Sequence, residues 1–397
     1  MANVSSSNGL EKYPKLRFKG FSEPWKTDTL GNLGTFMKGA PLSKADITDE
    51  GTPFVLYGEL YTTYGEVAHS IQRRTDRVVE PQFYSRVGDV IMPTSGETPE
   101  DIATASCIML PNVILAGDLL IYRTKKVDGR LVSFVVKNKV NKQISSVAQG
   151  KSVVHVRAEE LSKVAISYPS DAEQQKILTM LELLEDKIAK QRELIEHLKK
   201  YKRGVSIAIF DRKLSLVKNS PSWIKTTVGE ICKITMGQSP DSESYNTDQL
   251  GIPLVQGNAD MKNRITCPQR YTNKPTKICD EGSIILSVRA PVGSVGRADR
   301  KVCLGRGVCA INADNNDFLY YFFERNEPYW KRIEQGGTFT AISGDDIAEM
   351  PIEYPCLEER KIIADFLLKI DNHIAVAENI LSQLLLLKSG LLQQLFI

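Results

Sequence analysis

The sequence has little excess charge of either sign. Its 51 lysine and arginine residues are nearly balanced by 48 aspartate and glutamate residues, which leaves a formal net charge of +3. A strongly basic chain would indicate a polyanionic partner through its overall electrostatic field. The charge balance by itself therefore does not indicate a polyanionic partner, and any basic surface must be local.

Long apolar runs and paired cysteines are also missing. No uninterrupted run of about 18 apolar residues occurs, and the opening residues MANVSSSNGLEKYP lack the apolar segment of a signal peptide. The most apolar stretch, Val376 to Ile397, is interrupted by polar residues, so we expect no membrane anchor. The seven cysteines are scattered without a C-x-x-C pair, which is typical of free thiols in a reducing compartment. These features indicate a cytoplasmic protein.

Motifs for catalysis are absent from the sequence as well. No stretch follows the phosphate-binding pattern G-x-x-x-x-G-K-[ST], and no N-P-P-[YF] or D-P-P-[YF] tetrapeptide is present to hold a flipped adenine. The four histidines are isolated, and no cysteine cluster suits zinc. Cys303 and Cys309 resemble alternating strand positions more than a metal pair. The sequence therefore predicts no catalytic residue, no bound cofactor and no metal site in this chain.

The strongest positive feature is an internal repeat. The segment AISYP at residues 165–169 reappears 186 residues later as PIEYP at residues 351–355, and this offset holds without a gap from 161–210 to 347–396. The beginnings of the two copies match at an offset of 198 residues, through W-x4-L-G-x-L and W-x4-V-G-x-I. A repeat of this length predicts two structural units built on one plan.

The middle of each copy differs, as TSGETPEDIATA in the first and VRAPVGSVGRA in the second show. We therefore predict an α+β fold in which two α+β domains stand in tandem and each is followed by a long helix. The predicted segments are a flexible tail (1–15), a first domain (16–168), a central helix (169–212), a linker (213–221), a second domain (222–354) and a C-terminal helix (355–397). Short β-rich runs at 90–92, 132–136 and 284–286 predict strands.

The two helical segments carry a coiled-coil pattern. Apolar residues recur at alternating spacings of four and three over three heptads, which is more specific than general amphipathicity. The predicted seam residues are Ile177, Leu181, Leu184, Ile188, Gln191, Ile195 and Leu198 in the first helix and Ile363, Leu367, Ile370, Ile374, Ala377, Leu381 and Leu384 in the second. Gln191 is the one polar member and could fix the register.

We expect the two helices to pair antiparallel, related by a pseudo-two-fold axis, so that each helix starts where the other ends. A helix over residues 171–208 would be about 55 Å long at about 1.5 Å per residue. That length could hold two domains one or two turns of DNA apart, since one turn is about 34–36 Å. The extra leucines after Leu384 exceed what one seam needs and indicate a second packing surface.

Loops with cationic and amide side chains occur in both domains, as readers of base edges and phosphates require. The candidate DNA-binding residues are Lys38, Arg73, Arg74, Thr94, Ser95, Lys151 and Ser152 in the first domain, and Gln238, Gln256, Asn258, Arg289, Arg306, Thr338 and Thr340 in the second. Turn chemistry or a solvated charge explains any one of them better than a DNA contact does. The hypothesis therefore depends on the whole set.

Five segments stand out: the start PKLRFKGFSEPW (14–25), the two junctions P…EQQKI (169–177) and P…ERKII (355–363), and the pair SVRAPVG (287–293) and GRGVC (305–309). With them the chain resembles one known family, the specificity subunits of type I restriction–modification systems. The second junction has Glu-Arg where the family usually has Glu-Gln. The resemblance covers nearly the whole chain.

The resemblance implies a function without catalysis by this chain. Each domain would be a target-recognition domain for one half of a bipartite site in double-stranded DNA, and the helices would set the spacer between the halves. Two methyltransferase subunits, with S-adenosylmethionine, and two restriction subunits, with ATP and magnesium, would complete the restriction system. The pseudo-two-fold symmetry further predicts DNA methylation on opposite strands at the two half-sites.

Two other functions remain open at this point. A coiled-coil scaffold with two protein-binding globular ends would show the same repeat, but it would lack sequence-dependent and salt-dependent affinity for DNA. A self-contained nuclease or methyltransferase would need a catalytic constellation that the sequence does not contain.

Overall fold

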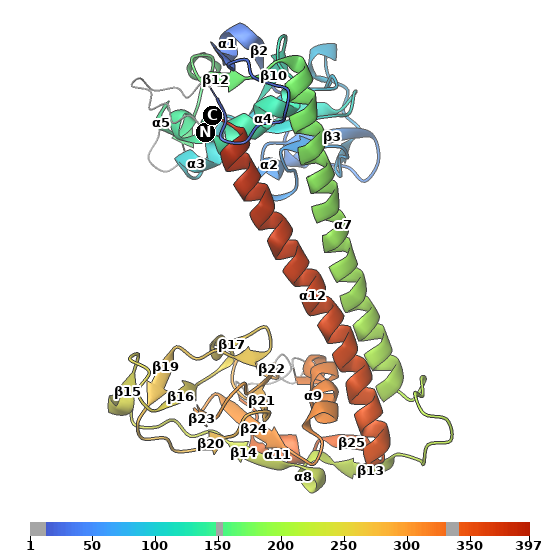
Figure 1. The fold of residues 1–397 in the computed structure, drawn as a ribbon. Coiled ribbons are helices and arrows are strands. Elements are labelled where there is room, and N and C mark those ends of the chain that lie inside the picture. The colour runs from blue at the N-terminus through green and yellow to red at the C-terminus, as the bar shows by residue number, and fades with distance from the viewer. Residues whose placement is uncertain (1–12, 148–153, 331–340) are drawn as a thin grey trace. The chain divides into compact units, whose positions relative to one another are not determined.

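The structure, a computed structural model, describes residues 13–147, 154–330 and 341–397. Contacts divide the chain into unit 1, residues 1–191 and 380–397, and unit 2, residues 192–379. Each unit contains one α+β domain and part of two long helices, α7 (Asp171–Phe210) and α12 (Leu357–Leu395) (Figure 1). The predicted tandem of α+β domains, each followed by a long helix, is confirmed.

Domain 1, residues 26–168 of unit 1, is built on short strands. These are β1 (Lys26–Thr29), β2 (Gly34–Lys38), β3 (Thr52–Leu56), β4 (Val67–Ala68), β5 (Arg74–Thr75), β6 (Asp89–Pro93), β7 (Ser95–Gly96), β8 (Ser106–Ile108), β9 (Ile114–Ala116), β10 (Leu119–Thr124), β11 (Val154–His155) and β12 (Ala165–Tyr168). The helices are α1 (Leu30–Leu33), α2 (Glu59–Thr62), α3 (Pro99–Ile102), α4 (Gly129–Asn138), α5 (Asn141–Val147) and α6 (Ala158–Leu161). The larger sheet has the order β2-β10-β6-β8-β4, the smaller β5-β3-β9, and β1 pairs antiparallel with β12.

Domain 2, residues 224–354 of unit 2, repeats this frame. Its strands are β13 (Ile224–Thr227), β14 (Lys233–Met236), β15 (Tyr245–Asn246), β16 (Ile252–Val255), β17 (Met261–Lys262), β18 (Ile265–Thr266), β19 (Arg270–Thr272), β20 (Ile278–Cys279), β21 (Ile284–Ser287), β22 (Val295–Arg297), β23 (Val302–Leu304), β24 (Val308–Asn312) and β25 (Pro351–Tyr354). The described helices are α8 (Val228–Ile231), α9 (Asn316–Arg325) and α11 (Gly344–Ala348). The order β14-β24-β21 corresponds to β2-β10-β6 of domain 1, and β13 pairs with β25 as β1 does with β12.

The strand predicted at residues 132–136 is wrong, because this run lies inside α4. Asp128 caps that helix by accepting a hydrogen bond of 2.9 Å from the backbone N–H of Arg130, and the run is buried where α4 packs against β6 and β8. A short run of β-branched residues fits a buried helix as well as a buried strand. The strands predicted at 90–92 and 284–286 are confirmed within β6 and β21.

A buried carboxylate marks the start of each long helix. Glu173 in α7 accepts hydrogen bonds from Nε and Nη2 of Arg17, both at 2.8 Å. Its repeat equivalent, Glu359 in α12, accepts one from the indole N–H of Trp223 at 2.9 Å. A buried carboxylate is stable only with such partners. These hydrogen bonds therefore attach each helix to the segment that leads into its own domain.

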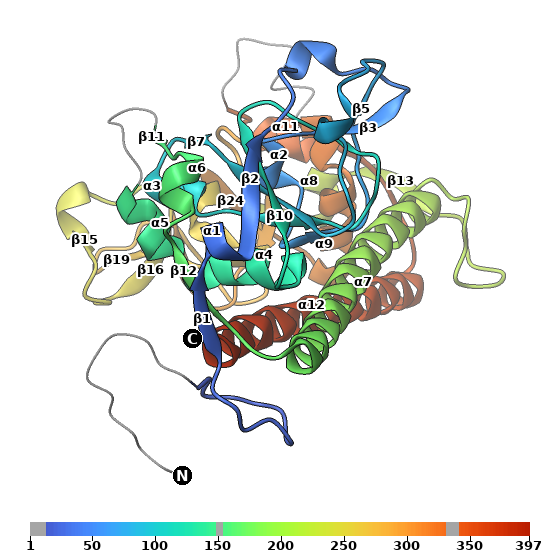
Figure 2. The same ribbon diagram turned by 90° about the horizontal axis from the view of Figure 1, so that it is seen from above.

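The end of α12 completes the core of unit 1. Ile177 of α7 and Leu395 of α12 belong to the same buried cluster as the domain, and Phe396 lies between Trp25 and Phe134, with ring centroids 6.4 Å from each. Figure 2 shows this end of α12 beside α4. The domain core is therefore closed by residues far away in the sequence.

The end of α7 has the same role in unit 2, where Ile209 shares a buried cluster with Trp223 and Phe318. Ion pairs fix the direction of the helices there: Lys199 lies 2.8 Å from Glu378, and Lys202, further along α7, binds a residue nearer the start of α12. The helices of this unit are therefore antiparallel.

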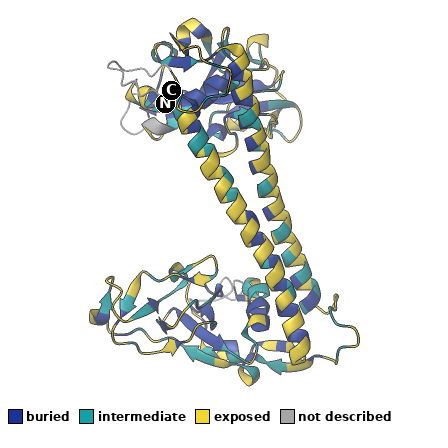
Figure 3. Cartoon of the chain, in the orientation of Figure 1, coloured by how far each residue is buried: buried dark blue, intermediate teal, exposed yellow. Residues whose placement is uncertain are grey.

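Every predicted seam residue is buried or half-buried (Figure 3). The half-buried ones are Gln191, Leu198, Leu381 and Leu384. The opposite faces of the two helices are exposed, which is the division that a coiled-coil seam predicts.

Replacing Phe396 with alanine should lower the free energy of unfolding by about 3–5 kcal/mol, because it empties a fully buried aromatic site. Urea unfolding followed by circular dichroism would measure the loss. Leu386→Ala, within α12 at a position that is 71% exposed, is the matched control and should change stability by less than about 0.5 kcal/mol. Equal losses in the two variants would contradict the packing of α12 against domain 1.

Candidate nucleic-acid interface

Three loops of domain 2 meet at one edge of its sheets. We call them loop cluster 2: residues 237–239 after β14, 256–258 after β16 and 305–307 between β23 and β24. The backbone N–H of Gln238 donates to the carbonyl of Leu304 at 2.9 Å, and that of Gly305 donates to Val255 at 2.8 Å. A Cβ atom at Gly237 would lie 2.1 Å from the carbonyl oxygen of Gly305, so the close approach requires glycine.

Loop cluster 2 presents polar side chains that are held by one another. The amide of Gln256 donates to the Tyr245 hydroxyl at 3.2 Å, and its carbonyl oxygen accepts from Arg270 at 3.4 Å. Arg306 is exposed, and its backbone N–H donates to the Ser239 hydroxyl at 3.1 Å. Amide and guanidinium groups fixed in this way can read the donor and acceptor pattern of a base edge.

Domain 1 brings equivalent loops together at the same topological position. Loop cluster 1 comprises residues 38–40 after β2, 56–59 after β3 and 117–118 between β9 and β10. Its backbone bonds run from Gly39 to Leu119 at 3.0 Å and from Gly117 to Ala40 at 2.9 Å. The frames of the two clusters match, but the side chains differ: the turn that carries Arg306 in domain 2 carries Asp118 in domain 1.

A hollow of about 630 Å³ lies at loop cluster 1, and residues 42–45, Tyr57 and Arg73 are among those that line it. Arg73 donates from Nε to the buried carboxylate of Glu59 at 2.5 Å, while its side chain stays 43% exposed. Glu59 also accepts from the backbone N–H of Leu56 at 3.1 Å. Arg73 therefore stabilises residues 56–59 of loop cluster 1 and also places a positive charge beside the hollow.

The remaining predicted residues of domain 1 lie in different environments. Lys38 is exposed at the end of β2, and Arg74 is exposed and donates to the carbonyl of Gly51 at 2.9 Å. Thr94 is half-buried, with its backbone N–H bonded to Asp118 at 2.9 Å. Ser95 is buried in β7, where it pairs with His155 of β11, and its carbonyl oxygen accepts a hydrogen bond of 2.9 Å from the Tyr61 hydroxyl.

In domain 2, Arg289 is exposed and follows Val288, whose backbone N–H donates to Gly307 at 2.9 Å, so it lies next to loop cluster 2. Asn258 is half-buried at the start of a 3-10 turn. Lys151, Ser152, Thr338 and Thr340 lie outside the described residues. The sequence did not single out Lys44, Tyr57, Asp118, Tyr245 and Arg270, which lie at or beside the two loop clusters.

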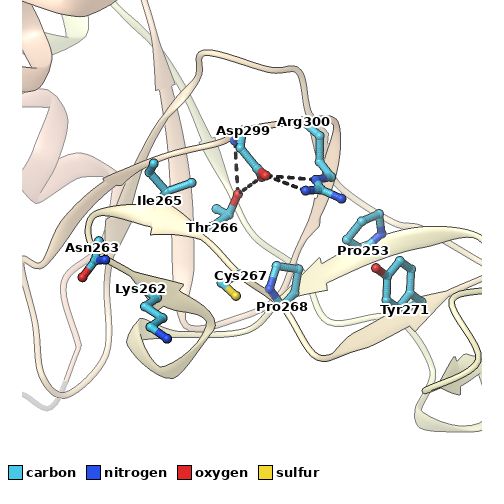
Figure 4. A pocket seen from close by; sticks show the side chains of 10 residues that line it. All are labelled: Pro253, Lys262, Asn263, Ile265, Thr266, Cys267, Pro268, Tyr271, Asp299 and Arg300. Atoms are coloured by element: carbon cyan, nitrogen blue, oxygen red, sulfur yellow. Dashed lines mark hydrogen bonds and ion pairs between the residues drawn. The ribbon is translucent and has the colours of Figure 1, made fainter. Parts of the chain in front are cut away.

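A second hollow, of about 390 Å³, lies beside β17 and β18 (Figure 4). At its edge the Thr266 hydroxyl donates to Asp299 at 2.7 Å, and Arg300 donates to the same carboxylate at 2.7 Å. Lys262 and Tyr271 also line this hollow. None of the predicted DNA-binding residues lines it, so it is distinct from loop cluster 2.

The described residues contain no group of three or more His, Cys, Asp or Glu side chains that could hold a metal ion. Burial raises the pKa of the Cys279 thiol to about 11. It is therefore protonated at neutral pH and is a weak nucleophile.

Comparison with known proteins identifies the family. A family-level sequence profile described as "Type I restriction modification DNA specificity domain" matches residues 22–200 and 222–386. The MjaX specificity subunit of a type I restriction enzyme from Methanocaldococcus jannaschii is 32% identical over 289 residues, which cover 67% of each chain. The MjaIX specificity subunit from the same organism is 33% identical over 116 residues, or 27% of each chain.

Two solved structures share the fold. A type I restriction–modification S subunit from M. genitalium superimposes with a TM-score of 0.66 at 17% identity, over 97% of this chain and 99% of that one. A chain from a study of complex assembly and conformational transition in a type I R-M system gives 0.60 at 24% identity, over 94% and 97%. With two profile matches that coincide with the two repeats, this chain belongs to the specificity-subunit family of type I restriction–modification systems.

Proposed function

We propose that each domain reads one half of a bipartite DNA site, through loop cluster 1 in domain 1 and loop cluster 2 in domain 2. The observation that carries this proposal is the repeated frame with different side chains at the same edge. Two copies of one reader with identical loops would favour identical half-sites. The equivalent turn carries Asp118 in domain 1 and Arg306 in domain 2, so the two domains offer opposite charges to a base edge. We therefore expect the two half-sites to differ in sequence.

The proposal assigns all chemistry to partner subunits. Two methyltransferase subunits supply S-adenosylmethionine and base flipping, and two restriction subunits supply ATP hydrolysis with magnesium, while this chain binds no cofactor. If a pseudo-two-fold axis relates the repeats, as we expect from the sequence, the two methylated bases would be on opposite strands. We place this assembly in the cytoplasm.

The exposed face of α12 supports docking of the methyltransferase subunits. α12 is long and apolar enough for a membrane span by length and composition, yet most of its apolar stretch is not buried within the chain. Its exposed apolar side chains include Ile380, Leu385, Leu386 and Leu387. Exposed apolar side chains gathered in one segment are typical of a protein interface, and in a family that acts as a complex we assign them to the methyltransferase.

Replacing residues 222–354 with the corresponding domain of a relative should change one half of the methylated motif and leave the other half and the spacer unchanged, because loop cluster 1 and both helices are retained. Long-read methylation mapping in a host that supplies the methyltransferase subunit would measure this. Replacing residues 26–168 instead is the reciprocal control. A change in both halves, or in neither, would rule out one domain for one half-site.

We also propose that α7 and α12 set the spacer. Inserting four residues within 190–200 of α7 and four within 376–386 of α12 lengthens the pair by roughly 6 Å at about 1.5 Å per residue. The spacer should then grow by about two base pairs, since ten base pairs span about 34 Å. Four residues inserted in the linker at 213–221 should leave the spacer unchanged. A spacer length that is unchanged by the helix insertions, or that changes with the linker insertion, would disprove the proposal.

A further inference from the structure

One lysine in each unit joins both helices to the domain. In unit 1, Lys388 of α12 contacts the carboxylate of Glu185 on α7 and lies 3.0 Å from Glu66 of domain 1. In unit 2, Lys202 of α7 lies 2.6 Å from Asp371 on α12 and 2.7 Å from Glu324 of domain 2. Each lysine is therefore an ion-pair bridge between the opposite helix and the domain of its unit.

The helix residues of the two bridges occupy equivalent positions in the two repeats. Lys202 and Lys388 are 186 positions apart, and so are Glu185 and Asp371. Both lysines are well shielded from water, with side chains 12% and 19% exposed. The same two charges thus recur at the same two places in each half of the chain.

On the domain side, the carboxylate that binds the lysine comes from a different element in each unit. The ninth residue of α4 is Lys137, whereas the ninth residue of the equivalent helix α9 is Glu324. A cation at that place in domain 1 could not bind Lys388. Glu66, which precedes β4, lies between them instead, 3.5 Å from Lys137. The bridge is therefore present in both halves although the sequences that form it have diverged.

Each domain carboxylate also has a second cation. Glu66 binds Lys137, and Glu324 lies 3.2 Å from Nε of Arg264. Both units therefore contain a chain of four alternating charges, from helix carboxylate to helix lysine to domain carboxylate to domain cation. We call each chain a lysine clamp.

Glu66 and Lys388 of the unit 1 clamp are both ionised at neutral pH. Burial alone would raise the pKa of Glu66, but the charges of Lys388 and Lys137 hold it below its usual value. Burial alone would lower the pKa of Lys388, but the carboxylates of Glu66 and Glu185 raise it. Pairing therefore outweighs desolvation at both groups.

The clamp is one of several polar attachments of each domain to the helices, which in unit 1 include Arg130 to Glu182 at 3.0 Å. Another is at the start of each helix, where Glu173 or Glu359 is bound. Glu185 and Asp371 each lie 14 residues beyond the first residue of their helix, or roughly 21 Å along it. The clamp adds a polar contact at this distance to the apolar packing of the helix ends, and it would restrict rotation of the domain on the helix. Replacing a buried ion pair with apolar residues is often neutral for stability, which favours a role in specifying geometry.

We propose that Lys388 and Lys202 are positioning residues that lock each domain to both helices, so that one spacer length between the two half-sites is accepted. The inference rests on the proposed function. Neither lysine contacts DNA in this account; both act through the orientation of the loop clusters.

The test uses the full chain with its methyltransferase subunit and long-read methylation mapping. The readout is methylation at sites whose spacer is one base pair too long or too short, divided by methylation at sites with the correct spacer. Lys388→Met should raise this ratio by about tenfold, because removing one partner of a buried ion pair releases the attachment. Lys388→Arg should restore the wild-type ratio, since the guanidinium can bind both carboxylates.

Lys199→Met is the matched control. Lys199 also pairs between helices, with Glu378, but both side chains are about half exposed, at 49% and 48%, so the ratio should stay unchanged. Glu66→Gln removes only the domain carboxylate and tests the same clamp if Lys388→Met does not accumulate. A uniform fall in methylation with an unchanged ratio in both clamp variants would show a purely structural role and overturn the inference. If the wild-type chain itself gives no gapped motif, the proposed function fails instead.

Discussion

The structure depends on the burial of each helix end in the core of the other repeat's domain. Phe396, from the end of the second repeat, fills the core of domain 1, and Ile209, from the end of the first repeat, contributes to the core of domain 2. Neither domain has a complete core with only its own helix. Folding therefore couples the two repeats, because the large loss expected for an emptied aromatic site would fall on a domain far away in the sequence.

Because this coupling depends on the segments that match between the repeats, the side chains of loop clusters 1 and 2 can change while the fold stays the same. The residues that join helix to domain, such as Glu173, Glu359 and Trp223, lie in the segments that match between the repeats. Most residues of the loop clusters lie where the repeats diverge, and the two clusters share the backbone contacts seen at Gly39 and Gly237. Side chains such as Asp118 and Arg306 can therefore differ without disturbing the core.

The sequence predicted the parts of the structure that depend on local periodicity. The seam from Ile177 to Leu384 was identified because a 4-3 spacing of apolar residues has one common structural meaning. The run 132–136 was assigned wrongly, because β-branched residues fit a buried helix or a buried strand and only tertiary packing decides. The lysine clamps were missed for a related reason. Lys202 lies in a run of basic residues of the kind that normally faces solvent, Lys388 is a single cation in an apolar stretch, and their partners lie up to 322 residues away in the chain. For the same reason the burial of Ser95 and the pairing of Arg73 with Glu59 were not predicted.

We propose that this chain alone specifies which DNA sequence its complex modifies. The most direct measurement is long-read mapping of adenine methylation in a host that supplies the methyltransferase subunit, with and without the gene for this chain. We predict a motif of two different half-sites separated by an unspecified spacer, methylated on opposite strands, that disappears when the gene is deleted. A motif without a gap, or one that persists after deletion, would contradict the account.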